Sequence, residues 1–233
     1  MDQIPIGAYE LTVTMANFKQ VSTNLEVRLG SPVTVNLILP IGNVEETVVV
    51  QAGAAEVELS TSEISRNVSS ESIEDVPVLS RNPAELLQLF PGVPAITQDK
   101  NGSFTVGGLR PRSSTYNVDG SSNNFDVSSG PRTPVIREAV AEMRALTNVF
   151  SAQYGKGSGA VIDMVIKSGT NNFHGEVFEF HRNSALSANG FFNNARGLEK
   201  PKYISNIYGF TIGGPIVKNK TFFFFAFQGM LER

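Results

Sequence analysis

Hydrophobic and polar residues alternate with a period of two over residues 8–39, and this alternation is typical of strands with one buried face. It predicts three strands over residues 8–15, 21–29 and 33–39, with breaks at turn-forming residues such as Gly30 and Pro40. Three strands with one apolar face each form a poor sheet by themselves. We therefore expect this region to be the last part of a β-sandwich.

Residues 60–168 mix signals for short strands and short helices, which indicates an α+β domain. One helix is predicted from Pro83, because Asn82 can cap it and Glu85 has the spacing of a capping box. A second helix is predicted from Thr133 and Pro134 by the same logic. The expected strands cover residues 103–107, 114–119, 141–147 and 159–167, and residues 120–132 are expected to form a polar loop.

The last segment carries three aromatic-rich strands of about ten residues, which is a length that spans a membrane in a β-barrel. We predict them at residues 173–182, 206–216 and 221–229. The last two are joined by a tight turn at 217–220, and the first two by the long Asn-rich link 183–205. Short and long connections in alternation favour a transmembrane barrel, and a soluble sheet with an apolar core is the alternative.

Composition narrows the function classes. The 233 residues are 41% hydrophobic and 18% charged, which excludes a disordered tail, and the net charge of -3 gives no basic surface for nucleic acid. Absence of cysteine excludes disulfides and thiolate metal sites. The two histidines, His174 and His181, are seven apart on a predicted strand and so face opposite sides. We find no catalytic constellation, and we expect no enzyme activity, cofactor or metal.

Between the first two regions lies a short Val-rich segment at residues 47–50, flanked by Gly42 and Gly53. Its β-propensity is strong, but small residues isolate it from its surroundings. Such a segment can add a strand to the sheet of a partner, and a plain edge strand of the preceding sandwich is the other interpretation.

Several stretches, in the same order along the chain, resemble TonB-dependent outer-membrane receptors of the Oar-like group, which carry a carboxypeptidase regulatory-like domain in front. Arg81–Pro83 with Pro91–Val93 looks like the first plug helix, Lys167–Gly175 resembles the plug-to-barrel junction, and Gly213–Phe224 resembles the first barrel hairpin. One short stretch resembles the Ton box, and the resemblance implies that it binds TonB: Glu46, Thr47, Val48, Val49, Val50, Gln51 and Ala52.

The central plug signature is the other implied functional site. The positions that match it, which the resemblance links to gating, are Gly107, Gly108, Arg110, Arg112, Asp119 and Gly120. The three charged residues of this set are candidates for polar contacts between plug and barrel wall, and solvated charges of a surface turn are the alternative. The chain departs from the family pattern at Gln51, Ala160 and Asp163.

The resemblance implies a mixed fold of four parts: the end of a regulatory β-sandwich (1–41), the Ton box and linker (42–59), an α+β plug (60–170) and the first strands of an incomplete transmembrane β-barrel (171–233). The family barrel has 22 strands, and about three are present here. The start of the chain also lacks a signal peptide, so we expect a fragment with a truncated N-terminus.

The implied function is that of a receptor and transporter in the cell outer membrane. The plug, facing the periplasm, gates the uptake of a small molecule, an oligosaccharide or a peptide, and the Ton box couples it to TonB and the inner-membrane energising complex. The barrel contacts outer-membrane lipid. The alternative is a non-catalytic periplasmic or surface binding module.

Overall fold

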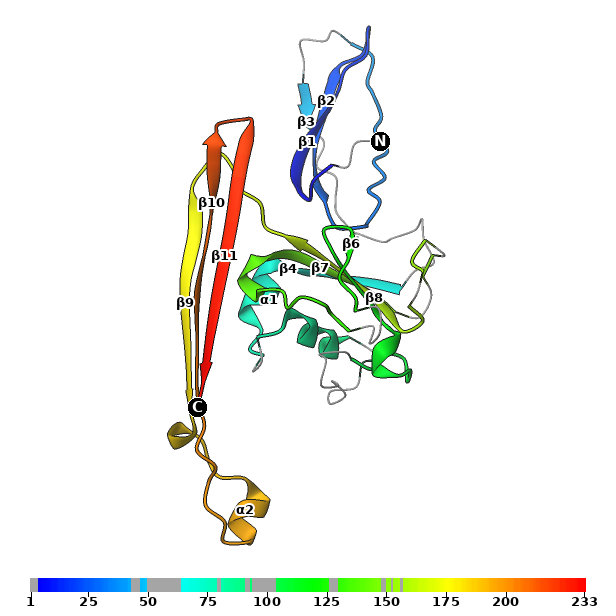
Figure 1. The fold of residues 1–233 in the computed structure, drawn as a ribbon. Coiled ribbons are helices and arrows are strands. Elements are labelled where there is room, and N and C mark those ends of the chain that lie inside the picture. The colour runs from blue at the N-terminus through cyan, green and yellow to red at the C-terminus, as the bar shows by residue number, and fades with distance from the viewer. Residues whose placement is uncertain are drawn as a thin grey trace. The chain divides into compact units, whose positions relative to one another are not determined.

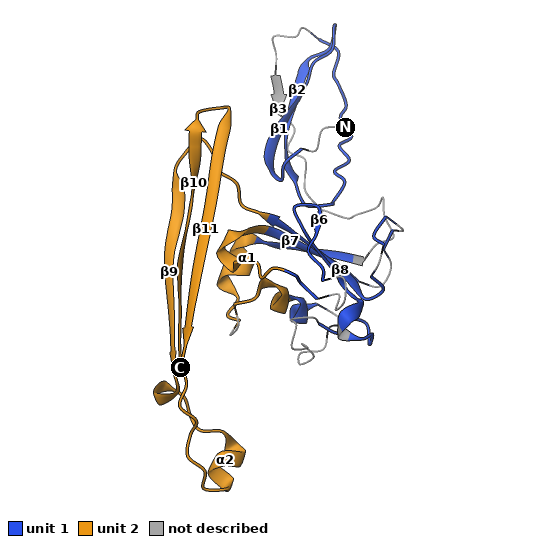
Figure 2. Ribbon diagram, viewed as in Figure 1, with its two compact units in different colours: residues 1–69, 87–132, 142–165 blue, residues 70–86, 133–141, 166–233 orange. Residues whose placement is uncertain are grey.

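The computed structural model (Figure 1) divides into two compact units, which are described separately (Figure 2). Unit 1 contains residues 1–69, 87–132 and 142–165, and unit 2 contains residues 70–86, 133–141 and 166–233. The structure describes residues 4–42, 47–49, 64–78, 81–90, 93, 104–125, 130–147, 150–151, 153–155 and 157–233, with 47–49, 64 and 111 described by their backbone alone.

The front sheet of unit 1 has three strands in the order β1 (Gly7–Val13), β2 (Gln20–Val27) and β3 (Thr47–Val49). β1 and β2 are antiparallel, while β3 runs parallel to β2. The first two predicted strands are thereby confirmed. The third prediction, residues 33–39, is wrong: this stretch alternates between exposed and half-buried residues but joins no ladder. The edge of β2 is occupied by β3 instead.

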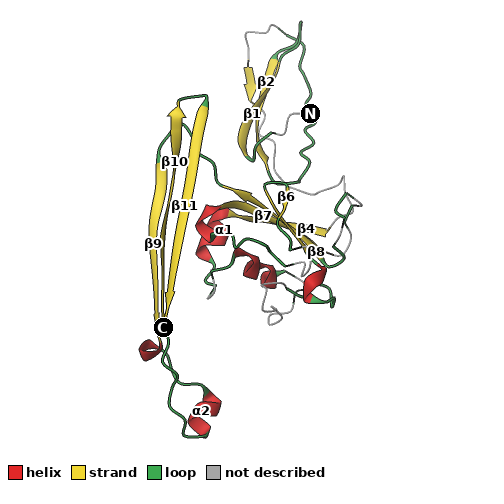
Figure 3. Ribbon diagram, viewed as in Figure 1, coloured by secondary structure: helices red, strands yellow, loops and turns green. Residues whose placement is uncertain are grey.

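A five-stranded sheet forms the centre of unit 1 (Figure 3). Its order is β4 (Ile64–Ser69), β7 (Val140–Thr147), β8 (Ala160–Ile166), β5 (Thr115–Val118) and β6 (Ser121–Ser122). The predicted strands at 114–119, 141–147 and 159–167 are confirmed. The strand predicted at 103–107 is not: of its described residues, only Phe104 makes a β-bridge. The predicted loop at 120–132 contains the two residues of β6.

The core of unit 1 lies against this sheet. Successive residues of β7 from Glu142 to Thr147 are all buried, so both faces of the strand are covered. Met143, Leu146 and Ile162 are completely inaccessible to solvent. Full burial of such side chains stabilises a fold by roughly 1.5–3 kcal/mol each.

Short helices connect these strands: α1 (Ser70–Asp75), and the 3-10 helices η1 (Pro83–Leu89), η2 (Pro111–Ser113) and η3 (Arg137–Ala139). The helix predicted at Pro83 is confirmed in place as η1, and the Asn82 side chain accepts a hydrogen bond from the Ala84 amide at 3.0 Å. The helix predicted from Thr133 is wrong. Only the three residues of η3 are helical there, because the residues that follow form the buried strand β7, which pairs with β4.

Unit 2 contains a sheet of three long antiparallel strands in the order β9 (His174–Asn183), β10 (Ile204–Val217) and β11 (Thr221–Glu232). All three were predicted, as was the tight turn between β10 and β11. The long Asn-rich link predicted between the first two strands is present between β9 and β10, and it holds η4 (Ser184–Leu186) and α2 (Phe191–Ala195) (Figure 3). Asn189 organises this link, since its side chain donates to the Leu198 carbonyl and accepts from the Gly190 amide.

The two faces of this sheet differ in chemistry. Residues that are partners in register point to the same side. One side also carries the polar residues Glu179, His181 and Asn206 toward the end of the strands. It is called the aromatic face after its large apolar members, which are Val177, Tyr208, Phe210, Ile212, Phe225 and Phe227. These side chains are exposed, from 39% for Phe210 to 87% for Val177. Phe210 packs against both Phe225 and Phe227, with ring centroids 5.7 and 6.0 Å apart.

The opposite side, called the mixed face, combines polar and apolar side chains: Glu176, Phe178, Phe180, Ile207, Thr211 and Gln228. Most of these residues are buried or half-buried within unit 2. Gly209 on this face lies beside its register partner Phe178, and a Cβ at position 209 would come within 2.5 Å of the Phe178 ring. Aromatic residues that cover glycines in this way fix the register of paired strands.

The fold is therefore a mixture of helix and strand in which strands dominate, arranged among the described residues as three open sheets. None of the described helices is long and apolar enough to cross a membrane.

Candidate functional site

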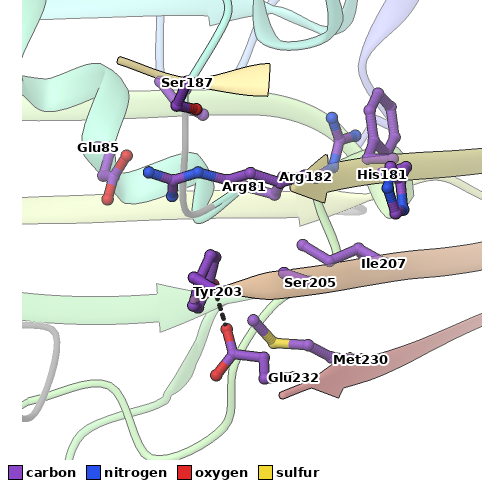
Figure 4. Close-up of a pocket in the computed structure, with 12 residues that line it drawn as sticks. Arg81, Glu85, His181, Arg182, Ser187, Tyr203, Ser205, Ile207, Met230 and Glu232 are labelled. Carbon is purple, nitrogen blue, oxygen red and sulfur yellow. Dashed lines mark hydrogen bonds between the residues drawn. The ribbon is translucent and has the colours of Figure 1, made fainter. Parts of the chain in front are cut away.

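A pocket of about 660 Å³ lies within unit 2 (Figure 4). One wall comes from Val78, Arg81 and Glu85, and the other comes mainly from the ends of β9, β10 and β11. The last residues of β9 and the first of β10 meet here because the two strands are antiparallel. The site thus joins residues that are about 150 positions apart in the sequence.

Arg81 is the most constrained side chain of the pocket. Its backbone is in the left-handed region, with φ of 59°. Its guanidinium forms an ion pair with Glu138, and both side chains are largely buried. The same guanidinium stacks over the Phe180 ring at 3.5 Å from the centroid and lies 5.8 Å from that of Phe178. Cation–π contacts of this kind gain strength when the cation is desolvated.

The pKa of Arg81 is lowered to about 10, chiefly by burial and also by the neighbouring Arg137, while Glu176 opposes the shift. Arg81 therefore remains a cation at neutral pH. One oxygen each of Glu138 and Glu176 is buried without a hydrogen-bond partner. Charges of both signs thus lie together in a poorly solvated position, in a cluster made of Arg81, Arg137, Glu138 and Glu176. Removing one charge would leave the opposite charges buried without compensation.

Arg137 holds the end of α1. Its guanidinium donates hydrogen bonds to the carbonyls of Ile73 and Val76, at the end of α1. Burial lowers the pKa of Arg137, and Glu74 and Asp75 oppose this effect. Glu74 also accepts a hydrogen bond from Lys167 at 2.6 Å. These contacts tie α1 to η3 and to the start of the segment that leads into β9.

The mouth of the pocket is polar on one side and apolar on the other. The Tyr203 hydroxyl donates to Glu232 at 2.7 Å (Figure 4), and the Arg182 guanidinium lies 5.2 Å from the Tyr203 ring. Ile207 and Met230 supply apolar surface. A pocket with this lining can bind a ligand that has both polar and apolar parts. Among the described residues no group of three His, Cys, Asp or Glu side chains has the arrangement of a metal site.

The residues predicted as the plug signature lie in unit 1, and the lining of the pocket does not include them. Gly107 and Gly108 form an exposed turn with φ of 61° and 75°, which explains the need for glycine. Arg110 and Arg112 are exposed on either side of Pro111.

Asp119 and Gly120, the remaining signature residues, make the turn between β5 and β6, and both have positive φ. The Asp119 amide donates to the Met164 carbonyl at 2.9 Å, which attaches this turn to β8. The turn geometry thus accounts for the residue types at both positions.

The predicted TonB-binding stretch is described only in part. Glu46, Val50, Gln51 and Ala52 lie outside the described residues, whereas the backbone of Thr47, Val48 and Val49 forms β3. Sequence reasoning named Arg81 only as part of the stretch that resembles the first plug helix, and it did not name Arg137 or Glu138. The one local signal was the position of Arg81 directly before the helix cap Asn82.

Comparison with known proteins adds to this picture. Residues 165–233, which include β9, β10 and β11, match the family described as outer membrane beta barrel domain. A curated relative, the TonB-dependent transporter Oar of Myxococcus xanthus, is 27% identical over 244 residues, which cover 99% of this chain and 23% of the relative. The chain is related to the TonB-dependent outer-membrane receptors. The predicted resemblance is thereby confirmed.

Solved structures agree at the level of the fold. The outer membrane transporter YddB of Escherichia coli superposes with a TM-score of 0.55 at 17% identity, covering 72% of this chain and 26% of its own. The siderophore receptor PirA of Pseudomonas aeruginosa gives 0.52 at 20% identity, covering 72% and 27%. The curated relative is a TonB-dependent transporter, and together with the matched barrel domain it supports an outer-membrane location. The chain spans about a quarter of the length of these relatives.

Proposed function

We propose that this chain is a part of a TonB-dependent outer-membrane receptor that takes up a small molecule, an oligosaccharide or a peptide. Residues 60–170 act as the plug that gates uptake, and residues 171–233 form the first strands of the barrel wall. Residues 42–59 contain the Ton box and its linker, and residues 1–41 are the last strands of a regulatory β-sandwich. TonB, driven by the inner-membrane energising complex, pulls on the Ton box.

The single observation that carries this proposal is the difference between the two faces of the β9–β11 sheet. The aromatic face exposes large apolar side chains on three neighbouring strands, whereas the mixed face carries Glu176, Thr211 and Gln228. Apolar outside and polar inside is the pattern of a barrel in lipid. A self-standing binding module in water would leave this apolar surface uncovered, which soluble proteins rarely do.

The pocket fits the same proposal. It lies on the side of the sheet that carries the mixed face, which a closed barrel would turn toward its lumen. Arg81 belongs to the plug segment and stacks on Phe180 of the proposed wall, so the pocket adjoins a contact between plug and wall. A ligand that enters it meets residues of both parts, as gating by a ligand requires.

The proposal is tested by the binding of a peptide with the sequence of residues 42–56 to the purified periplasmic C-terminal domain of TonB from the same cell. We expect a dissociation constant on the order of micromolar, because backbone pairing of one short strand gives modest affinity. The matched control is the same peptide with Val49→Pro, which loses a backbone donor. Absence of binding, or binding that the proline leaves unchanged, would mean that these residues are not a Ton box. The chain would then have no link to TonB, and a non-catalytic binding module would be favoured.

A further inference from the structure

Two rows of side chains form the floor of the pocket in unit 2. Partners in register point to the same side of a sheet, so the ladder of β9, β10 and β11 defines these rows. The apolar row consists of Phe180, Ile207 and Met230. The polar row lies next to it, where β9 and β11 end and β10 begins, and consists of Arg182, Ser205 and Glu232. All six residues line the pocket, which therefore offers an apolar strip beside a charged one (Figure 4).

The two charged groups of the polar row differ in what they already contact. The Glu232 carboxylate accepts a hydrogen bond from the Tyr203 hydroxyl at 2.7 Å. The Arg182 guanidinium lies 5.2 Å from the centroid of the Tyr203 ring, and within the part of the chain that the structure describes it makes no hydrogen bond or ion pair. A guanidinium has five N–H donors, and stacking on a ring uses none of them. Arg182 can therefore bind a carboxylate in the two-point geometry that suits both groups.

The opposite wall supplies a carboxylate whose acceptors are also unused. Glu85 is the third residue of η1, the position from which a capping box would return its side chain to Asn82. The Asn82 side chain accepts from the Ala84 amide at 3.0 Å, whereas the Glu85 carboxylate makes no hydrogen bond or ion pair among the described residues. Glu85 lines the pocket instead (Figure 4), where it can receive a cationic group.

Arg81, the other cation of the lining, is already paired. Its guanidinium forms an ion pair with Glu138 and stacks on the Phe180 ring. Glu85 and Arg182 are therefore the two charged groups of the lining that a ligand can pair without displacing a contact between described residues. They have opposite signs and come from opposite walls.

We propose that this pocket binds a short apolar peptide with free termini. The α-ammonium group of the peptide contacts Glu85, its carboxylate contacts Arg182, and an apolar side chain lies on the apolar row of the floor. The inference rests on the proposed function and names one of the three substrate classes given there. The cavity of about 660 Å³ has the size usual for pockets that bind small ligands.

The pattern of charges favours a peptide over the other two classes. An uncharged oligosaccharide would cover Glu85 and Arg182 without pairing either of them, and burial of a charge without a partner is unfavourable. A small molecule with a single charge would pair one of the two and cover the other. A peptide with free termini carries one charge of each sign at its two ends, with apolar side chains between them.

The experiment measures the binding of trileucine to the whole chain in detergent by calorimetry. Four forms of the peptide are compared: both termini free, the amine acetylated, the carboxylate amidated, and both blocked. The variants Glu85→Gln and Arg182→Gln each remove one charge of the lining. The matched controls are Glu199→Gln and Lys202→Gln, which remove the same charges at exposed positions of the β9–β10 link outside the lining.

We expect acetylation and amidation each to weaken binding about tenfold, because each removes one hydrogen bond between charged groups. In Glu85→Gln, acetylation should no longer change the affinity, while amidation still does. In Arg182→Gln, amidation should no longer change it, while acetylation still does. The two control variants should respond to both modifications as the unchanged chain does.

Three results would overturn the inference: none of the four forms binds, all four bind equally, or the response to acetylation survives in Glu85→Gln. Failure of the proposed function is recognised separately, by the binding of the peptide of residues 42–56 to TonB. Binding to TonB without binding of trileucine overturns this inference alone. Binding of trileucine with the expected responses, but no binding to TonB, supports the peptide site and overturns the receptor.

Discussion

The central sheet of unit 1 and the three-stranded sheet of unit 2 use similar apolar residues in opposite ways. In β7, Met143, Ala145 and Leu146 are covered by the chain itself, and so are the polar residues between and beside them. In β10, every second residue over Tyr208, Phe210 and Ile212 is exposed although it is large and apolar. The strand β7 is buried by protein on both faces, whereas the sheet of unit 2 leaves a largely apolar face exposed.

This difference indicates the surroundings in which each sheet is stable. Strands buried on both sides need no alternation, while strands between two media alternate strictly. The exposed face of β9, β10 and β11 is largely apolar apart from Glu179, and its opposite face is mixed, so the medium on the exposed side is the less polar one. The match of residues 165–233 to an outer-membrane barrel domain agrees with this conclusion.

The largest expected effect comes from placing a charge on each sheet in turn. Leu146→Asp puts a carboxylate into a fully buried site, and we expect a loss of about 4 kcal/mol or more, enough to unfold unit 1. Phe225→Asp changes a side chain that is 53% exposed, so unit 1 should stay folded. We expect Phe225→Asp instead to weaken retention on phospholipid vesicles by up to about 2 kcal/mol. Hydrogen exchange of β7 and vesicle flotation measure the two effects.

The control for this pair is Thr221→Asp, which adds the same charge at the exposed start of β11 and should change neither measurement. If Phe225→Asp exposed β7 to exchange, or left vesicle retention unchanged, the aromatic face would not be a lipid surface.

An intermediate effect is expected at the charge pair that faces the mixed side of the sheet. Arg81→Ala leaves Glu138 buried without its ion-pair partner, and breaking such a pair costs about 3 kcal/mol. We expect exchange protection of residues 70–86 to fall about a hundredfold. Hydrogen exchange with peptide-level resolution measures this loss.

The matched variant replaces both charges, Arg81→Met with Glu138→Met. Apolar side chains of similar size often restore stability at a buried pair, so the double variant should recover most of the lost protection. Equal losses in the single and the double variant would show that the contribution of Arg81 is packing on Phe180 rather than charge.

Sequence reasoning succeeded where local chemistry decides the structure. The alternation in 206–216 and the polar residues of the following turn were enough to place β10 and its hairpin. It failed where a distant partner decides. Residues 33–39 have the alternation of a strand, but the edge that could pair with them belongs to β3. Thr133 and Pro134 have the residue types of a helix start. The residues from Val140 onward gain more from burial in β7 than a cap at Thr133 could supply, so no long helix forms.

The candidate site shows the same limit. The signature turns at Gly107 and Asp119 follow from residue types that tolerate positive φ, so a sequence can indicate them. The cluster of Arg81 and Glu138 joins two segments that no motif connects. The spacing of charged residues within each segment gives no signal that one side chain pairs with the other.

The smallest expected effect concerns Asp163, where the chain departs from the family pattern. Its carboxylate in β8 accepts a hydrogen bond from Asn117 of β5 at 2.6 Å. Burial raises the pKa of Asp163, and the hydrogen bond from Asn117 and the charge of Arg144 oppose this shift. A raised pKa means that the folded chain holds this proton more tightly than the unfolded chain does.

The sign of the pH dependence follows from that difference. Below the usual carboxyl pKa of about 4, both states are protonated and Asp163 carries no penalty. As the pH rises toward the folded pKa, the unfolded chain releases its proton first, and the fold loses stability. Asp163→Asn removes the titration, and its side-chain oxygen can still accept from Asn117. We therefore expect a gain of less than about 1 kcal/mol at pH 7, because the site is partly solvated, and no gain near pH 3.

Urea unfolding in detergent, measured at a series of pH values, checks this expectation. Glu10→Gln serves as the control, since it changes the net charge equally at an exposed position of β1. A gain for Asp163→Asn that is equal at pH 3 and pH 7 would mean that it arises from packing or amide hydrogen bonding rather than from the proton. A loss at pH 7 would mean that the interaction with Arg144 outweighs burial, so that the central sheet of unit 1 depends on a buried charge as the Arg81 cluster of unit 2 does.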